Sequence, residues 1–188
     1  MALIHGGQLQ KQIEKYQIPA EQWLDLSTGI SPTSYPIPVI PQSVWQQLPQ
    51  PQASLITAAK SYYGTQHIMA TSGSQAVIKQ LPQIFTTHLA ELNNEFKPQQ
   101  IDVWLPRVGY KEHEKAWRDN AFNIKQYDEL PSAAELSPHC IIVVINPNNP
   151  TGRLYNKVEM LALLAQVESR QGWLIVDEAF MDVITPNE

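Results

Sequence analysis

The sequence contains a single cysteine, no run of basic residues and no apolar segment of membrane length. Because Cys140 has no second cysteine to pair with, an intramolecular disulfide is impossible and a reducing compartment is the natural setting. A net charge of −5 argues against a nucleic-acid partner. Apolar runs such as Ile141–Ile145 are far shorter than the roughly 20 residues that cross a bilayer, and the N-terminus lacks a basic-then-apolar signal. We therefore expect a cytoplasmic protein with no membrane or nucleic-acid partner.

Proline is abundant instead, with 15 residues, and it crowds the segment that ends at Pro51. Each proline removes a backbone donor, so regular hydrogen bonding cannot continue through this segment. Residues 1–51 are therefore predicted to form an extended N-terminal arm with part of a small domain. One amphipathic helix is predicted within the arm, at Gln8–Tyr16. Residues 52–188 are predicted to form a large domain.

From residue 52 onward, helical patterns alternate with short apolar segments. Helices are predicted at Ser54–Tyr63, Ser74–Phe85, Lys111–Asn120 and after Asn156, and strands at Ile101–Leu105, Phe122–Tyr127, Ile141–Ile145 and Trp173–Val176. The last two strands are continuous and rich in β-branched residues, which is typical of strands buried on both faces. This alternation indicates an α/β fold with βαβ units, a mostly parallel sheet and helices on both of its sides.

The last predicted helix has the clearest start and stop signals. Asn156 and Glu159 resemble a capping box, and Gly172 is predicted to stop the helix. Gly64 is predicted to close the Ser54–Tyr63 helix in the same way. The apolar stripe of the last helix is predicted to consist of Val158, Leu161, Leu164, Ala165 and Val167.

The segment Asn146–Gly152, with the sequence Asn-Pro-Asn-Asn-Pro-Thr-Gly, follows a predicted buried strand. Ligands of open α/β sheets bind at the carboxyl ends of the strands. Two prolines and a glycine restrict the backbone, so the side chains of Asn148 and Asn149 can be held in fixed directions. An ordinary strand-to-helix turn explains the same residues equally well.

Two other segments could also bind a ligand. One lies at the end of a predicted strand and the other at the start of a predicted helix. Trp173–Phe180 delivers the Asp177 carboxylate at the end of an apolar strand, where a charge needs a partner such as a protonated pyridine nitrogen. A salt bridge or a helix cap would also satisfy it. Thr71–Ala76 precedes a helix and offers backbone N–H groups to an anion such as phosphate, although Ser72 or Ser74 is also a good N-cap.

In their order and spacing, the three segments resemble those of aspartate-aminotransferase-like, fold-type-I enzymes, which use pyridoxal 5′-phosphate (PLP). His5-Gly6-Gly7, Leu24–Pro32 and Gly109–His113 further resemble the threonine-phosphate decarboxylases of cobalamin biosynthesis, relatives of histidinol-phosphate aminotransferase. The resemblance spans essentially the whole chain. It implies a three-layer αβα PLP-transferase large domain at 52–188, incomplete at its C-terminal part, and a homodimer for the intact enzyme.

The resemblance also implies roles for individual residues. Asp177 would keep the pyridine nitrogen protonated, and Tyr110 would stack on the ring. The other implied cofactor-binding residues are Gly73, Ser74 and Gln75 for the phosphate, and Asn149 for the phenolic oxygen. The residues implied to contact the substrate, a phosphorylated amino acid, are His5, Gly6 and Gly29. No metal site is expected.

Three functions remain open at this stage. The first is decarboxylation of L-threonine O-3-phosphate to aminopropanol phosphate, which Phe180 favours because many of the aminotransferases have tyrosine there. The second is an aminotransferase reaction of the histidinol-phosphate type. The third is a truncated, non-catalytic product, because no lysine follows Lys157 and the resemblance places the Schiff-base lysine beyond the Asp177 strand. Without the strands that follow in the family, the sheet is expected to expose an apolar edge.

Overall fold

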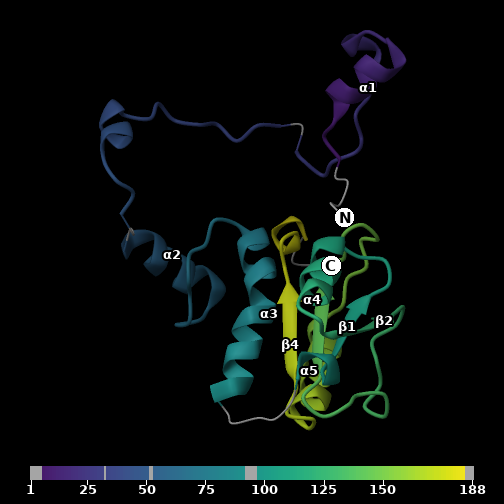
Figure 1. Ribbon diagram of the computed structural model, residues 1–188. Coiled ribbons are helices and arrows are strands. Elements are labelled where there is room, and N and C mark those ends of the chain that lie inside the picture. The colour runs from purple at the N-terminus through teal and green to yellow at the C-terminus, as the bar shows by residue number, and fades with distance from the viewer. Residues whose placement is uncertain (1–5, 32, 51–52, 92–96, 185–188) are drawn as a thin grey trace. The chain divides into compact units, whose positions relative to one another are not determined.

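The structure is a computed structural model that describes residues 6–31, 33–50, 53–91 and 97–184 (Figure 1). The chain divides into two compact units, Met1–Met69 and Ala70–Glu188. Because residues 52–69 fall in the first unit by their contacts, their assignment to the large domain stays a prediction. None of the described helices is long and apolar enough to span a membrane.

The first unit contains short helices without buried residues. They are α1 (Leu9–Tyr16), η1 (Ala20–Gln22), η2 (Gln42–Gln46) and α2 (Ala53–Tyr63). Trp23 fixes the turn after α1, because its indole nitrogen donates to the Ile18 carbonyl oxygen at 3.1 Å and its ring packs on Tyr16. Gly64 follows α2 with φ +63°, a conformation that suits glycine, as predicted.

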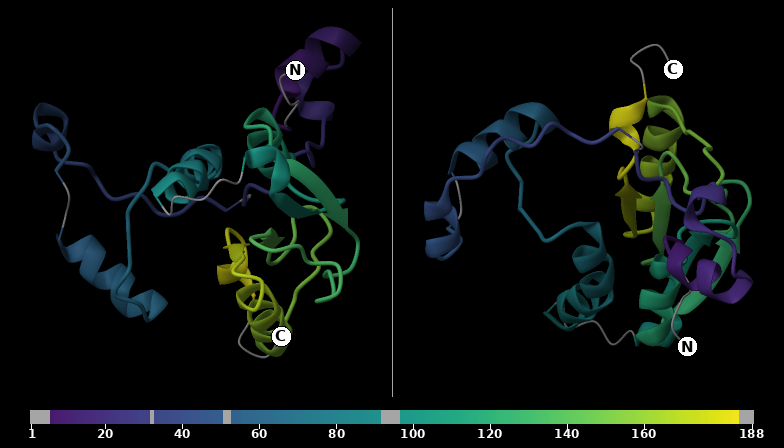
Figure 2. Two further views of the ribbon diagram at one scale, coloured as in Figure 1. Left: turned by 60° about the horizontal axis from the view of Figure 1, so that its bottom comes forward. Right: turned by 90° about the horizontal axis from the view of Figure 1, so that it is seen from above.

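The second unit contains a four-stranded, fully parallel sheet in the order β2-β1-β3-β4 (Figures 1 and 2). Its strands are β1 (Asp102–Pro106), β2 (Asn123–Tyr127), β3 (Ile141–Ile145) and β4 (Trp173–Asp177). Its helices are α3 (Ser74–Glu91), η3 (Pro98–Gln100), α4 (Lys111–Asp119), α5 (Lys157–Glu168) and η4 (Met181–Val183). The predicted α/β class and parallel sheet are confirmed.

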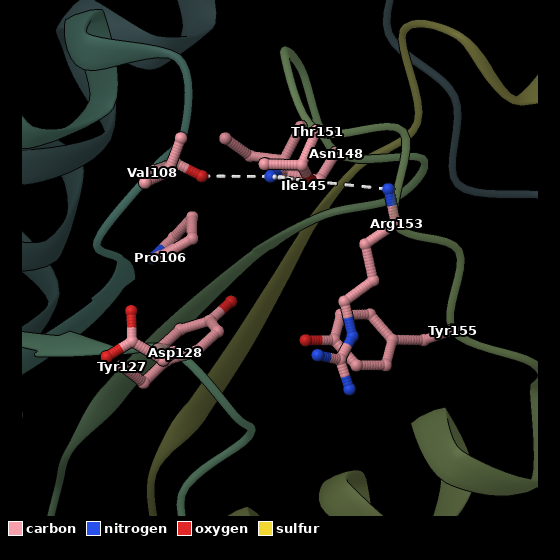
Figure 3. Close-up of a pocket in the computed structure, with 9 residues that line it drawn as sticks. All are labelled: Pro106, Val108, Tyr127, Asp128, Ile145, Asn148, Thr151, Arg153 and Tyr155. Carbon is pink, nitrogen blue, oxygen red and sulfur yellow. Dashed lines mark hydrogen bonds between the residues drawn. The ribbon is translucent and has the colours of Figure 1, made fainter.

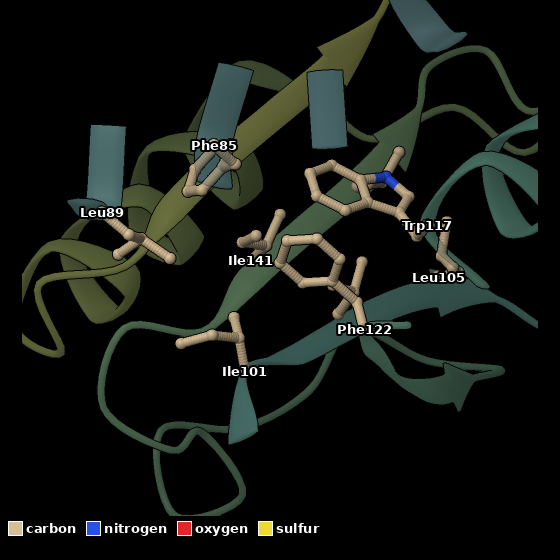
Figure 4. Close-up of a cluster of buried hydrophobic side chains, with 9 residues drawn as sticks. Phe85, Leu89, Ile101, Leu105, Trp117, Phe122 and Ile141 are labelled. Atoms are coloured by element: carbon tan, nitrogen blue, oxygen red, sulfur yellow. The ribbon is translucent and has the colours of Figure 1, made fainter. Parts of the chain in front are cut away.

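Strand β3 forms the centre of the core and separates two layers of side chains. Ile141 and Val143 pack with Phe85 of α3 and Trp117 of α4 (Figure 4). The alternate residues Ile142 and Val144 pack in a second cluster that contains residues of α5. Since neighbouring residues of a strand point to opposite faces, helices cover both faces and the fold has three layers.

Strand β4 differs from its prediction, because it is not buried on both faces. Trp173 is 45% exposed and Val176 is also exposed, whereas every residue of β3 is buried. In the described residues β4 pairs with β3 on one side and with no strand on the other. The apolar run Trp173–Val176 therefore forms an exposed edge of the described sheet, and an apolar edge is expected from the sequence.

Two predictions about α5 are wrong in detail, and the first concerns its apolar stripe. The capping box between Asn156 and Glu159 is present, but Val158 is 77% exposed. Of the predicted stripe only Val167 is buried, and the other buried residue of the helix is Leu163. Helix periodicity allows more than one face of α5 to be buried. The face that packs against Ile142 and Val144 is the one that contains Leu163 and Val167.

The second concerns the glycine after α5, which has a packing role and does not stop the helix. The helix ends at Glu168, and the left-handed residue that follows is Gln171, with φ 54°. A Cβ on Gly172 would lie 2.5 Å from the Cys140 carbonyl oxygen, so this glycine permits close approach to the backbone that precedes β3.

These two neighbours give opposite predictions for substitution. Gly172→Ala should lower the free energy of unfolding by about 1–3 kcal/mol because the new methyl group overlaps backbone atoms. Gln171→Gly should raise it by up to about 1 kcal/mol because glycine adopts the left-handed conformation without strain. Urea unfolding of both variants checks this, and a neutral Gly172→Ala would contradict the close contact.

Candidate functional site

The ends of three parallel strands bring polar side chains to one edge of the sheet. Tyr110 follows β1, Asn146 follows β3 and Asp177 is the last residue of β4. Because the strands are parallel and adjacent in the order β1-β3-β4, their carboxyl ends lie together. The helices α4 and α3 complete this edge, since residues at the N-termini of both bond to one another.

Asp177 is bound by His113, which the sequence alone does not identify as a site residue. His113 Nε2 lies 2.8 Å from Asp177 Oδ2, and the backbone N–H of Ala179 donates to Oδ1 at 3.1 Å. The histidine side chain is 2% exposed and that of Asp177 is 11% exposed. The hydrogen bond from His113 lowers the pKa of Asp177 below its usual value, although burial acts in the opposite direction. The carboxylate is therefore ionised at neutral pH.

The charge of Asp177 also determines which nitrogen of His113 faces it as a donor. An ionised carboxylate only accepts hydrogen bonds, so the proton of the pair lies on Nε2. His113 Nδ1 is buried and has no hydrogen-bond partner within the described part of the chain. His113 stands one helical turn after Tyr110, and this spacing is the signal that could have identified it from the sequence.

Tyr110 lies at the start of α4 and is tied to α3 through its hydroxyl group. Its hydroxyl donates to Gln75 Oε1 at 3.1 Å, and Gln75 Nε2 donates to Glu112 Oε2 at 2.7 Å. The Tyr110 ring meets the His113 ring edge-on, with centroids 6.4 Å apart. Burial raises the pKa of Tyr110, and the charges of Glu112 and Asp177 add to this, so the hydroxyl stays protonated.

The N-terminus of α3 is open to a ligand. Ser72, Gly73 and Ser74 are exposed, and Gly73 has φ +91° with no atom within 4 Å of an added Cβ. The first N–H groups of a helix have no partner within the helix and carry its positive dipole end, so they favour an anion. Since the Gln75 side chain is bonded to Tyr110 and Glu112, an anion here would meet backbone N–H groups.

The Asn146–Gly152 turn holds its shape through two asparagine side chains. Asn146 Nδ2 donates to the Tyr155 carbonyl oxygen at 2.9 Å, and its Oδ1 accepts from the Tyr155 N–H at 2.8 Å. Asn148 Nδ2 donates to the Val108 carbonyl oxygen at 2.9 Å. Both asparagines are buried, so they fasten the turn to its neighbours, while Asn149 is only half-buried.

A cavity of about 240 Å³ lies under this turn, on the side of β2 (Figure 3). Its walls come from the ends of β1, β2 and β3 and from the turn. They are Pro106, Val108, Tyr127, Asp128, Ile145, Asn148, Thr151, Arg153 and Tyr155. None of the residues in the Gln75, Tyr110, His113 and Asp177 set lines it, so the cavity is separate from that set.

The residues predicted to contact substrate belong to the first unit. A Cβ on Gly6 would lie 1.9 Å from the Ser27 carbonyl oxygen, and the Gly7 N–H donates to Ser27 Oγ at 2.9 Å. The segment before α1 thus packs directly on the loop that contains Gly29, which is exposed. His5 lies outside the described residues.

Residues 41–187 match the family described as aminotransferase class I and II. The chain is 39% identical over 180 residues to threonine-phosphate decarboxylase of Pseudomonas aeruginosa, in an alignment that covers 96% of this chain and 50% of that protein. It is 34% identical over 186 residues to a Sinorhizobium sp protein of the same name, covering 96% and 51%. The chain therefore spans about half the length of the curated relatives it matches.

A solved structure supports the same fold. Cystalysin from Treponema denticola, whose structure contains a PLP cofactor, matches with a TM-score of 0.59 at 16% identity. The match covers 78% of this chain and 41% of that one. At this identity the likeness shows the fold alone.

The bond between His113 and Asp177 gives a prediction about acid stability. Replacing His113 by leucine should lower the free energy of unfolding at neutral pH by about 1–3 kcal/mol, because the carboxylate loses its principal donor. A lowered carboxyl pKa stabilises the fold above the unfolded value of about 3.9, and this contribution is lost as the pH falls through the folded value. The difference in the free energy of unfolding between wild type and variant should therefore become smaller at acid pH.

Urea unfolding across a pH series measures this difference. Asp177→Asn and the double variant with His113→Leu provide the control, because the two losses should be less than additive if the groups act as a pair. A deficit that is the same at every pH would contradict the assignment.

Proposed function

Because this chain belongs to the aminotransferase class I and II family, we propose that its second unit binds PLP at the carboxyl edge of the sheet. The observation that carries the proposal is the Asp177 carboxylate, which is kept ionised by His113 at the end of β4. An ionised carboxylate in a largely buried position attracts a cationic partner, and a protonated pyridine ring is one.

The groups around Asp177 fit the cofactor in their chemistry. The open N-terminus of α3, with Gly73 and Ser74, suits the phosphate. The Tyr110 ring, which meets the His113 ring edge-on, offers an aromatic face. Asn149, half-buried in the turn that follows β3, offers a side-chain amide. An anion site, an aromatic face, an amide and a carboxylate are what a phosphorylated, hydroxylated pyridine requires.

When bound, PLP supplies an electron sink for the negative charge that develops at the substrate Cα. The residues of this chain would then position the cofactor and set the charge of its ring. Asp177 keeps a proton on the ring nitrogen, and His113 keeps Asp177 ionised and oriented. Tyr110 covers one face of the ring and excludes water from it. Asn149 donates to the phenolic oxygen, and backbone N–H groups at Gly73–Gln75 hold the phosphate.

For the whole protein we propose decarboxylation of L-threonine O-3-phosphate, the step in cobalamin biosynthesis that forms aminopropanol phosphate. The carboxyl group leaves as carbon dioxide, and a proton replaces it at Cα. The names of the two relatives and the presence of Phe180 support this proposal. We assign substrate contact to His5, Gly6 and Gly29, and we propose a cytoplasmic homodimer.

For the 188-residue chain by itself we propose reversible cofactor binding without turnover. No lysine follows Lys157, and Lys111, at the start of α4, donates to the Arg107 carbonyl oxygen and to Glu114. Borohydride treatment of the chain with equimolar PLP should therefore leave no stoichiometric lysine adduct. A single reduced adduct found by mass spectrometry would contradict this.

PLP titration followed by absorbance tests the cofactor site. Asp177→Asn should weaken PLP binding about 10-fold or more, because a neutral amide cannot balance a protonated ring. Asp128→Asn is the matched control, since Asp128 forms an exposed ion pair with Arg107 and should leave the affinity unchanged. Equal affinities of wild type and Asp177→Asn would contradict the proposed site.

A chimera tests the activity. Residues 1–184 of this chain, followed by the remaining half of the Pseudomonas aeruginosa relative, should release carbon dioxide from L-threonine O-3-phosphate. Conversion of histidinol phosphate to the corresponding ketone, with its amino group transferred to an added 2-oxo acid and no carbon dioxide released, would contradict the decarboxylase assignment and favour an aminotransferase.

A further inference from the structure

We propose that Glu112 is a positioning residue, which acts through the Gln75 amide to orient the Tyr110 hydroxyl and ring beside the cofactor site. This inference rests on the proposed PLP site for its functional meaning. Its structural part concerns only three side chains of the second unit and the two hydrogen bonds that connect them.

The orientation of the Gln75 amide follows from the charge of Glu112. A carboxylate only accepts hydrogen bonds, so the group that faces Glu112 Oε2 at 2.7 Å must be the Gln75 NH₂. The Gln75 oxygen then faces Tyr110, and at 3.1 Å the Tyr110 hydroxyl must donate its proton to it. A neutral side chain at position 112 would permit either direction, so the charge at Glu112 selects one.

These two hydrogen bonds hold the Tyr110 hydroxyl in one orientation. Tyr110 occupies the N-cap position of α4 without a side-chain capping bond, so the cap does not orient it. Glu112 lies in the first turn of the same helix, while Gln75 comes from the first turn of α3. The bonds therefore link the backbone of the proposed phosphate site to the ring of the proposed stacking residue.

The surrounding charges favour the same arrangement. Burial raises the pKa of Tyr110, and the negative charges of Glu112 on α4 and Asp177 on β4 raise it further, so Tyr110 remains a donor. His113, a further titratable group in contact with the Tyr110 ring, is bonded to Asp177 and meets the ring edge-on. The Gln75 side chain is itself neutral, so the charge of Glu112 determines which end of its amide faces Glu112.

The first test exchanges the two groups in the apoprotein. Gln75→Glu places two carboxylates together and should raise the equilibrium constant of unfolding about 10-fold. Glu112→Gln should raise it about 3-fold, because it removes the charge on a hydrogen bond. In the double variant the amide stands at position 112 and the carboxylate at position 75. The amide can then donate to the carboxylate, which also accepts from the Tyr110 hydroxyl, and we expect stability close to wild type.

The rescue is the decisive quantity, because a glutamate in the first turn of α3 also gains from the helix dipole. The control pair is Gln75→Glu with Glu114→Gln, a residue of the same helix as Glu112 that pairs with Lys111 and Arg118. This pair should show no rescue. Additive effects of Gln75→Glu and Glu112→Gln would overturn the proposal.

The second test measures PLP affinity with Gln75→Leu and Tyr110→Phe. Each single substitution should weaken binding about 3- to 10-fold, and the double variant should be no weaker than the worse single variant. Additive losses would show that Gln75 acts on PLP independently of Tyr110 and would overturn the positioning role. A wild-type chain that binds no PLP would instead overturn the proposed function, and the apoprotein rescue would still decide the orientation of the amide.

Discussion

A single hydrogen bond, from His113 to Asp177, joins the end of the outermost strand to the first turn of α4. The strand alone would leave a carboxylate largely buried, which is unfavourable without a donor. The histidine supplies this donor and keeps the carboxylate charged. Every function proposed for the chain depends on that charge, because without it the edge of the sheet would present a neutral acid to the cofactor ring.

The rest of the fold holds this pair in place. The buried strand β3 lies between β1 and β4, so it sets the spacing between Tyr110, which follows β1, and Asp177. On one face, Phe85 and Trp117 pack α3 and α4 against the sheet, and this packing brings Gln75 to Tyr110. The hydrogen bonds among Glu112, Gln75 and Tyr110 then connect the N-terminus of α3 to the Tyr110 ring. Packing of the core thus determines the geometry of the polar edge.

The sequence was sufficient for elements whose signals are local. The run Ile141–Ile145 predicted a buried parallel strand, and the Asn156 and Glu159 capping box predicted the start of α5. Features that depend on what packs nearby were wrong or missed. Leu163 is buried because it packs with residues of β3, and Gly172 lies close to the backbone of Cys140. The spacing of apolar residues within a helix contains no information about these neighbours. The exposure of Trp173 follows from its place at the edge of the described sheet.

The candidate site shows the same division. Asp177 is predicted from its place at the end of an apolar strand and Tyr110 from the family resemblance. The structure brings both to one edge, but their roles stay predictions. His113 was missed because a buried histidine has no distinguishing pattern in a sequence beyond its spacing from Tyr110. Asn148 proved to be a buried support of the turn, and contact of Asn149 with the cofactor stays a prediction.

The protonation state of bound PLP tests the central claim most directly. PLP labelled with ¹⁵N in its ring can be titrated with the 188-residue chain while the nitrogen chemical shift is recorded. If Asp177 is the ionised partner that we describe, the ring nitrogen should remain protonated in the complex at a pH where it is neutral in free PLP. A ring nitrogen that is neutral in the complex at that pH would contradict the account.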